Sequence, residues 1–309
     1  MASSSKEQVK SILQQNKKTF LSGEEIADRL GLSRNAVWKA VKSLRAEGYA
    51  IDAETRRGYC LVAEPDLLDE EKIRKCLEDT WSEVLKDEKD QKNGEVKETF
   101  LNLTEKEKTS FISKENKSSP VLTSPSSFHI KVYPEIDSTN QEGKRLAIAG
   151  AESGTVILAD QQTAGRGRRS NAFASPAGGL YFSLLLRPDG EKPVLSTTDP
   201  KEIMTRSLEA ACACVDRVTG KKISYEANDL YLDGRKVGGI LTESGYEFES
   251  GLLQWVVIGV GLNVKTDLSQ LPEETRMRAG SLYPAEDDHS LKNELAAGLI
   301  VEFARRLIL

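Results

Sequence analysis

The residues of this sequence that could most clearly take part in chemistry are a short run of glycines and arginines within Gln161–Arg169. It reads Gln-Gln-Thr-Ala-Gly-Arg-Gly-Arg-Arg. Glycine lets backbone amides come close to a phosphate, and each guanidinium can hold a phosphate through two parallel hydrogen bonds. A disordered arginine-glycine tract or an exposed basic turn would look similar. Because strands are predicted on both sides, at Thr155–Ala159 and Leu180–Leu186, we expect a rigid anion-binding loop.

A second polar segment, Asp137–Asn140, reads Asp-Ser-Thr-Asn and follows a predicted strand that ends at Tyr133. Its small hydroxyl and amide groups could hydrogen-bond the polar end of a ligand. They could equally cap a helix that begins at Gln141, which is the favoured interpretation when the segment is taken alone.

A third segment, Asn228–Leu241, places a lysine on a predicted hairpin. The pair Asp233-Gly234 is typical of a two-residue hairpin turn. The turn would return Lys236 beside Asn228 and Asp229, where an ammonium group can neutralise a developing phosphate charge without acting as a nucleophile. In isolation, the same lysine would be read as an ordinary surface residue on a hairpin.

Metal chemistry and covalent catalysis find little support in the composition. The chain has four cysteines, none in Cys-x-x-Cys spacing, and two histidines. We therefore expect no structural zinc site and no metal ligands among the protein's own side chains. We also find no Ser/His/Asp or Cys/His constellation that would activate a nucleophile.

The three segments lie in a region, 128–309, where apolar runs alternate with helical patterns. This alternation predicts an α/β domain built on a mixed sheet. The predicted strands are His129–Tyr133, Thr155–Ala159, Leu180–Leu186, Lys222–Tyr225, Gly239–Glu243 and Gln254–Val260. The predicted helices are Gln141–Ala149, Ile203–Val218 and Ser290–Leu309.

The first 64 residues predict a winged helix-turn-helix. A helix over 6–15 precedes Ser22, which opens a second helix with Glu25 as the partner of a capping box. Gly31 supplies the positive φ of a helix end, and Ser33 caps a third helix. Two short strand patterns around a polar turn then form a β-hairpin wing.

This front end has the features of a DNA reader. Residues 1–62 carry 11 lysines and arginines against 7 acidic residues, whereas the whole chain has a net charge of −5. Arginine and asparagine can pair with base edges, and lysine with phosphates. The whole pattern favours DNA binding over a unit that only mediates protein contacts. The predicted DNA-binding residues are Ser33, Arg34, Asn35, Trp38, Lys39, Lys42, Arg56 and Arg57.

Between the two domains, residues 65–127 predict a connecting segment. A helix over 66–83 is followed, from about Lys86 to Ser127, by a charged stretch poor in large apolar residues, which we expect to be a disordered insertion. No apolar run approaches the ~18 residues of a membrane span, and Met1–Lys10 does not resemble a signal peptide. We expect a soluble cytoplasmic protein that makes no membrane contact.

Taken together, these segments resemble the bifunctional, DNA-binding form of the biotin protein ligase family, the biotin–[acetyl-CoA-carboxylase] ligases that repress the biotin operon. The resemblance covers 5–83 and 128–309. It rests on Asp137–Asn140, Gly165–Arg169, Asn228–Glu243 and Gly259–Val264, a combination far more specific than any one piece. It implies an α+β protein with a winged helix-turn-helix followed by a mixed-sheet ligase domain of the biotin/lipoate type.

The resemblance also implies a function. Such proteins use ATP, with Mg²⁺, to convert biotin to biotinyl-5′-AMP. They pass the biotinyl group to a lysine of the biotin carboxyl carrier protein, an acetyl-CoA carboxylase subunit. They bind operator DNA in response to biotin, as ligand-linked homodimers. In this chain, the loop Leu271–Ser281 would fold over the adenylate.

Site residues follow from the resemblance position by position. Arg168 and Lys236 would be catalytic. The biotin site would contain Ser138, Thr139, Asn140, Gln162, Arg166, Gly167, Arg168, Lys236 and Gly239. The adenylate site would contain Arg166, Arg168, Asn228 and Asn263.

The chain departs from the family pattern at several positions. Tyr225-Glu226-Ala227 stand where the family has Lys-Trp-Pro, Ser170 replaces a glycine and Ala174 an aromatic residue. A Glu226 side chain turned into the site would oppose ATP. The chain ends at Leu309, so we expect the family's C-terminal β-barrel to be absent.

These departures leave two alternatives to an active ligase. One is a non-catalytic sensor that binds biotin or biotinyl-AMP and regulates DNA binding. The other is a lipoate or octanoyl transferase, which shares this catalytic fold. The Gly-Arg-Gly-Arg-Arg loop and the fused DNA reader argue against the transferase.

Overall fold

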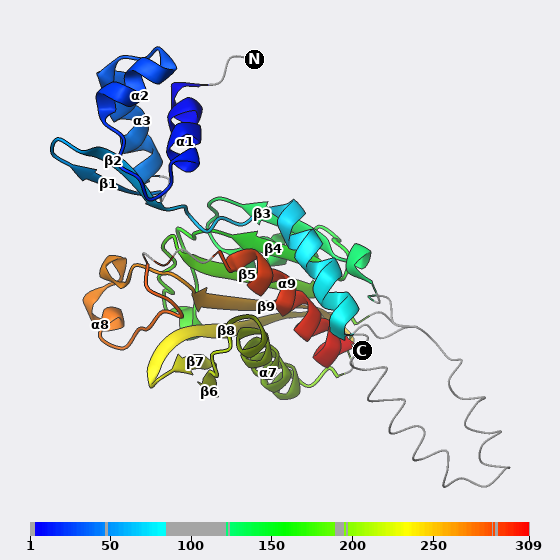
Figure 1. Ribbon diagram of the computed structural model, residues 1–309. Coiled ribbons are helices and arrows are strands. Elements are labelled where there is room, and N and C mark those ends of the chain that lie inside the picture. Colours follow the sequence, from blue (N-terminus) through cyan, green and yellow to red (C-terminus); the bar gives the residue numbers. More distant parts are fainter. Residues whose placement is uncertain are drawn as a thin grey trace, which may run out of the picture.

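The computed structural model describes residues 4–46, 49–84, 122, 124–188, 195, 197–285, 287 and 290–308. An N-terminal helical domain with a hairpin is joined through a short segment and a helix to a larger domain built on one sheet (Figure 1). The predicted fold class, a winged helix-turn-helix followed by a mixed-sheet domain, is confirmed.

The N-terminal domain has three helices and a wing. The helices are α1 (Ser5–Gln15), α2 (Gly23–Leu30) and α3 (Arg34–Ala46), and the wing pairs β1 (Ala50–Glu54) with β2 (Gly58–Ala63). The predicted start and stop signals act as expected. Ser22 Oγ accepts the Glu25 amide at 3.0 Å, Gly31 has φ +64°, and Ser33 Oγ accepts the Ala36 amide at 3.1 Å.

The larger domain contains a seven-stranded sheet in the order β3-β4-β5-β9-β8-β7-β6. Only β3 and β4 are parallel, and every other neighbouring pair is antiparallel. The strands are β3 (His129–Tyr133), β4 (Thr155–Ala159), β5 (Gly179–Leu186), β6 (Ser224–Glu226), β7 (Asp229–Leu232), β8 (Arg235–Tyr246) and β9 (Leu253–Asn263). The short strand β7 was not predicted, and β8 is longer than expected at both ends.

Helices cover both faces of this sheet. On one face, the main core joins the sheet to α7 (Pro200–Thr219), α9 (Lys292–Phe303) and the helix over 70–84, as Figure 1 shows. On the other face, α6 (Thr139–Ile148) packs through Ala147 against Leu185 and Val257. Every residue of β4 and β5 is buried, which explains their continuous apolar sequences.

The connecting segment differs partly from the prediction. The predicted helix begins at residue 70 rather than 66, and residues 85–121 of the predicted insertion lie outside the described residues. The end of the predicted disordered stretch belongs to the fold. Leu122 is buried in the main core and Pro125–Ser127 form a turn of 3-10 helix. Two apolar residues, Val121 and Leu122, in an otherwise polar stretch are too few to carry a periodic signal that would have revealed this packing.

The segment 66–69, which precedes the connecting helix, is bound to the sheet domain. The Asp66 carboxylate accepts the Leu291 and Lys292 amides at 2.8 and 3.0 Å and the Ser290 hydroxyl at 2.8 Å. It therefore caps the N-terminus of α9 from a distant part of the chain. None of the helices in the described ranges is long and apolar enough to span a membrane.

Candidate active site and DNA surface

One cavity, of about 1230 Å³, collects the predicted ligand residues. It is formed by the start of α6, the glycine-arginine loop, the β7–β8 hairpin, the end of β9 and the segment 271–279. Lining residues include all of those predicted for the biotin and adenylate sites: Ser138, Thr139, Asn140, Gln162, Arg166, Gly167, Arg168, Asn228, Lys236, Gly239 and Asn263.

The Asp-Ser-Thr-Asn segment enters the cavity at the N-terminus of α6. Ser138 occupies the capping position, but its side chain makes no capping hydrogen bond, although it is 2% exposed. Thr139 and Asn140 are tied to the protein. Gln162 Oε1 accepts the Thr139 amide at 2.8 Å, and Asn140 Nδ2 donates to Glu243 Oε2 at 3.1 Å. The Ser138 hydroxyl is thus the polar group of this segment left for a ligand.

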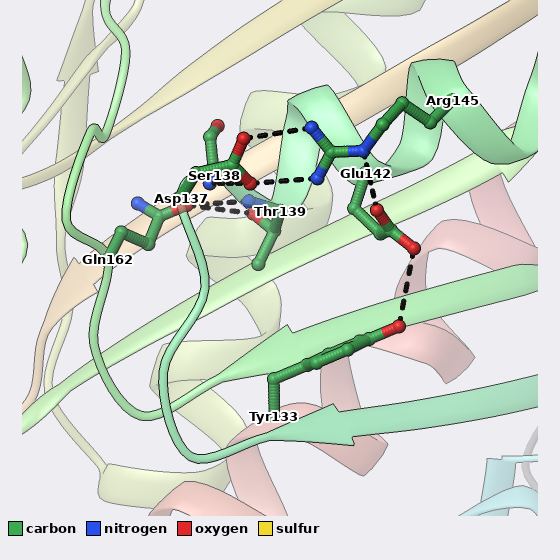
Figure 2. Close-up of polar contacts among 7 residues, drawn as sticks. All are labelled: Tyr133, Asp137, Ser138, Thr139, Glu142, Arg145 and Gln162. Carbon is green, nitrogen blue, oxygen red and sulfur yellow. Dashed lines mark hydrogen bonds and ion pairs between the residues drawn. The ribbon is translucent and has the colours of Figure 1, made fainter.

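A network of ion pairs and hydrogen bonds adjoins the same segment (Figure 2). Arg145, on α6, donates from Nη1 and Nη2 to the two carboxylate oxygens of Asp137, each at 2.8 Å. Its Nε donates to Glu142 at 2.8 Å, and the Tyr133 hydroxyl donates to Glu142 at 3.3 Å. The Arg145 guanidinium lowers the pKa of Asp137 to about 2. Sequence reasoning did not single out Arg145, because an exposed arginine on a helix carries no distinctive signal.

The glycine-arginine loop is a tight, hydrogen-bonded hairpin. The Phe173 amide donates to Gly165 O at 2.9 Å and the Gly167 amide to Asn171 O at 2.8 Å. A Cβ at Gly165 would lie 2.4 Å from Phe173 O, so only glycine fits there. Arg166 and Arg168 are exposed, and neither has an ion-pair partner among the described residues.

Lys236, on β8, projects into the same cavity, on the side of the β7–β8 hairpin. The predicted Asp233-Gly234 turn forms, with both residues at positive φ. Lys236 Nζ lies 2.8 Å from Asp229 Oδ1 and 6.0 Å from the centre of the Phe173 ring. The lysine is thus held by a carboxylate partner and an aromatic face.

Glycines form the base of the site. A Cβ at Gly259 would lie 2.0 Å from Asn140 Oδ1, and one at Gly261 would lie 2.6 Å from the Phe173 ring. A Cβ at Gly239 would lie 3.2 Å from Asp229 Oδ1. Larger residues on these strands would therefore displace the side chains that surround the cavity.

The two predicted adenylate asparagines line the cavity, and their amides also hold the structure together. Asn228 Nδ2 donates to Ile240 O at 3.2 Å, and Asn263 Nδ2 donates to Gly280 O at 2.9 Å. The Gly280 amide in turn donates to Lys236 O at 2.8 Å. The segment 271–281 is thereby anchored along the edge of the cavity, where the prediction placed a loop that closes over an adenylate.

The cavity carries a strong positive charge. Six lysine and arginine side chains line it, against the carboxylates of Asp229 and Glu274. Three of these basic residues, Arg169, Arg235 and Arg278, were not predicted as site residues. Arg169 is the last residue of the Gly165–Arg169 motif but was given no role, whereas Arg235 and Arg278 are brought to the cavity together only by the pairing of β8 with the segment 271–281. Such a cavity is suited to a ligand with several phosphates.

The three substitutions at Tyr225–Ala227 lie outside the site. None of these residues lines the cavity, and Tyr225 is 42% exposed. Glu226 is not among the residues that line the cavity, so the condition under which it would oppose ATP is not met. Ala227 has φ +52°, a conformation that proline cannot adopt.

The predicted DNA-binding residues are all exposed in the N-terminal domain. Ser33, Arg34, Asn35, Trp38, Lys39 and Lys42 are exposed on and just before α3, and Arg56 and Arg57 on the wing. Lys42 Nζ lies 5.4 Å from the Trp38 ring centre. Arg57 has partners of its own, because its Nη1 lies 2.8 Å from Glu54 Oε2 and its guanidinium lies over the Phe20 ring.

Comparisons with known proteins agree with this arrangement. Residues 132–263 match the Biotin/lipoate A/B protein ligase family, and residues 6–60 match an HTH domain. The Bifunctional ligase/repressor BirA of Bacillus subtilis (strain 168) is 30% identical over 93% of this chain and 73% of its own length. The protein of the same name from Escherichia coli (strain K12) is 28% identical over 93% of this chain and 72% of its own.

A solved structure, the biotin protein ligase from Aquifex aeolicus in complex with biotin and ATP, is 27% identical. The match covers 58% of this chain and 69% of that chain, with a TM-score of 0.47.

Proposed function

The chain belongs to the family of bifunctional biotin ligase/repressors, and from that premise we propose how its two domains work. The ligase domain activates biotin with ATP and transfers it to a carrier protein, and the winged domain represses transcription. The observation that carries the assignment of the site is that Arg166 and Arg168, from the glycine-arginine loop, and Lys236, from strand β8, line one cavity.

In the first step, a biotin carboxylate oxygen attacks the α-phosphorus of ATP. The bond to pyrophosphate breaks, leaving biotinyl-5′-AMP. Both reactants are anions, so Arg166, Arg168 and Lys236 screen their repulsion and hold them in line. Lys236 reaches the phosphate by leaving Asp229, its partner at 2.8 Å. The Ser138 hydroxyl, with no partner in the cap, hydrogen-bonds biotin.

In the second step, a lysine amine of the biotin carboxyl carrier protein attacks the acyl carbon. The acyl–phosphate bond breaks, AMP leaves, and the amine proton passes to solvent. The glycine-arginine loop keeps water from the mixed anhydride until then. Mg²⁺ would enter bound to the ATP phosphates and would neutralise part of their charge.

The repressor half of the proposal assigns α3 to the major groove. Arg34 and Asn35 read base edges, while Lys39, Lys42 and the wing arginines contact phosphates. A ligand-linked homodimer and a cytoplasmic location, where ATP and DNA are available, complete the proposal. The dimer is tested by sedimentation with and without biotin and ATP.

The decisive experiment incubates the full chain with labelled biotin, ATP and a biotin acceptor domain, and follows AMP release and acceptor labelling. We expect both, and we expect Lys236→Met to abolish them. Biotin binding in calorimetry without adenylate formation over hours would select the sensor instead. Binding of lipoate but not biotin would select the transferase.

A second experiment tests whether Arg168 retains the adenylate in the site. Arg168→Ala should release biotinyl-AMP prematurely, because the loop loses a guanidinium that holds the adenylate. Unchanged retention of the adenylate would refute that role.

A further inference from the structure

Arg145 does not line the cavity, but all three nitrogens of its guanidinium donate hydrogen bonds to residues near the cavity. Two of its nitrogens bond the two carboxylate oxygens of Asp137 and the third bonds Glu142. Glu142 is itself joined to Tyr133, at the end of β3 (Figure 2). The arginine is therefore held by three hydrogen bonds to two carboxylates, more than a typical exposed ion pair has.

Asp137, the partner of Arg145, joins two loops of the site. Its Oδ1 accepts the Ser138 amide at 2.7 Å, which sets the entry to the Ser138–Asn140 segment. Its main-chain carbonyl accepts the Ala164 amide at 2.9 Å, directly before the glycine-arginine loop. A change in the backbone at Asp137 would therefore reach both loops.

Arg145 also controls the charge at this point. Asp137 directly precedes Ser138, whose side chain lines a cavity suited to anionic ligands. Without the arginine, an uncompensated carboxylate would lie next to the Ser138–Asn140 end of the proposed biotin site. Arg145 thus favours biotin binding in two ways, because it holds Asp137 in place and neutralises its charge.

We propose that Arg145 is a positioning residue for biotin activation, acting through Asp137 on the Ser138–Asn140 segment and the glycine-arginine loop. This inference rests on the proposed ligase function and deepens it. It assigns a role to a residue that touches neither substrate. Its main effect is on biotin rather than ATP, because the Ser138–Asn140 segment is assigned to biotin alone, whereas Arg166 and Arg168 are assigned to both ligands.

The test compares the Michaelis constants of the full chain for biotin and for ATP. Arg145→Met should raise KM for biotin by roughly three- to tenfold, with KM for ATP within about twofold of the wild type. Arg145→Lys, which keeps the charge but loses the two-pronged geometry, should fall between. The double variant Asp137→Asn/Arg145→Met should have a KM for biotin no higher than that of the more impaired single variant, because each substitution removes the same Asp137–Arg145 contact.

Arg29→Met is the matched control. Arg29 pairs with Glu25 on α2 with a side chain 51% exposed, similar to Arg145 at 53%, but in the other domain. It should leave both constants unchanged. An active wild type with an unchanged KM for biotin in Arg145→Met would overturn the inference, as would equal increases in both constants. An inactive wild type would instead refute the ligase assignment, and calorimetric biotin affinity would then decide the role of Arg145.

Discussion

Lys292 and Asp160 form a buried ion pair although 132 residues separate them in the chain. Lys292 begins α9, whereas Asp160 follows β4 and precedes Gln162, a cavity residue, by two positions. Asp160 Oδ1 also accepts the Leu68 amide at 3.2 Å. This pair thus joins the segment after the DNA-binding domain, the last helix and the strand that leads into the site.

We expect Lys292→Met to destabilise the ligase domain by about 3–5 kcal/mol, because it leaves the Asp160 carboxylate buried without its cation. Urea unfolding of the full chain measures this loss. Asp160→Asn/Lys292→Met should recover part of it, since the amide oxygen can still accept the Leu68 amide. Equal stability of the single and double variants would contradict the charge argument.

Gly259→Ala should damage the site through Asn140. Its Cβ would lie 2.0 Å from Asn140 Oδ1, and the overpacking should cost about 1–3 kcal/mol. We expect weaker biotin binding in calorimetry together with a lower melting temperature. Gly23→Ala is the control, because its Cβ would make an ordinary contact with Tyr59 at 3.4 Å. Normal biotin affinity in Gly259→Ala would show that Asn140 is not needed in its present position.

Ala227→Gly should stabilise the protein by about 1 kcal/mol, because Ala227 has φ +52° and glycine adopts positive φ without strain. Ala227→Pro, which restores the family residue, should destabilise it, since proline holds φ near about −65°. Thermal unfolding of the two variants should move in opposite directions. Stabilisation by proline would mean that this turn has another conformation in solution.

The Asp137–Arg145 interaction should contribute to stability at neutral pH and weaken in acid. The folded-state pKa of Asp137, about 2, lies below the ordinary value of 3.8. Its contribution is therefore fully present above pH 3.8 and is lost as the pH falls toward 2. The stability difference between wild type and Asp137→Asn should shrink over that interval. A difference that stays constant from pH 7 to pH 2 would contradict this assignment.

Much of the local structure could be predicted because its causes lie within a few residues. Ser22 and Glu25 are one helical turn apart, and Gly31 ends the same helix. The Asp233-Gly234 turn likewise forms from its own conformational preferences. The strand β7 was missed, because four residues with one buried side chain carry too weak an alternating pattern.

The sequence by itself determined which groups are available: a basic helix-turn-helix, a glycine-arginine loop, a hydroxyl-rich turn and a hairpin lysine. Only the tertiary structure decided which of them meet. It placed Arg168 and Lys236 on one cavity, left Glu226 outside it, capped α9 with Asp66 and gave Asp137 its partner Arg145. The reason is that strand order and burial depend on contacts between residues far apart in the chain, and no short window of sequence contains both partners.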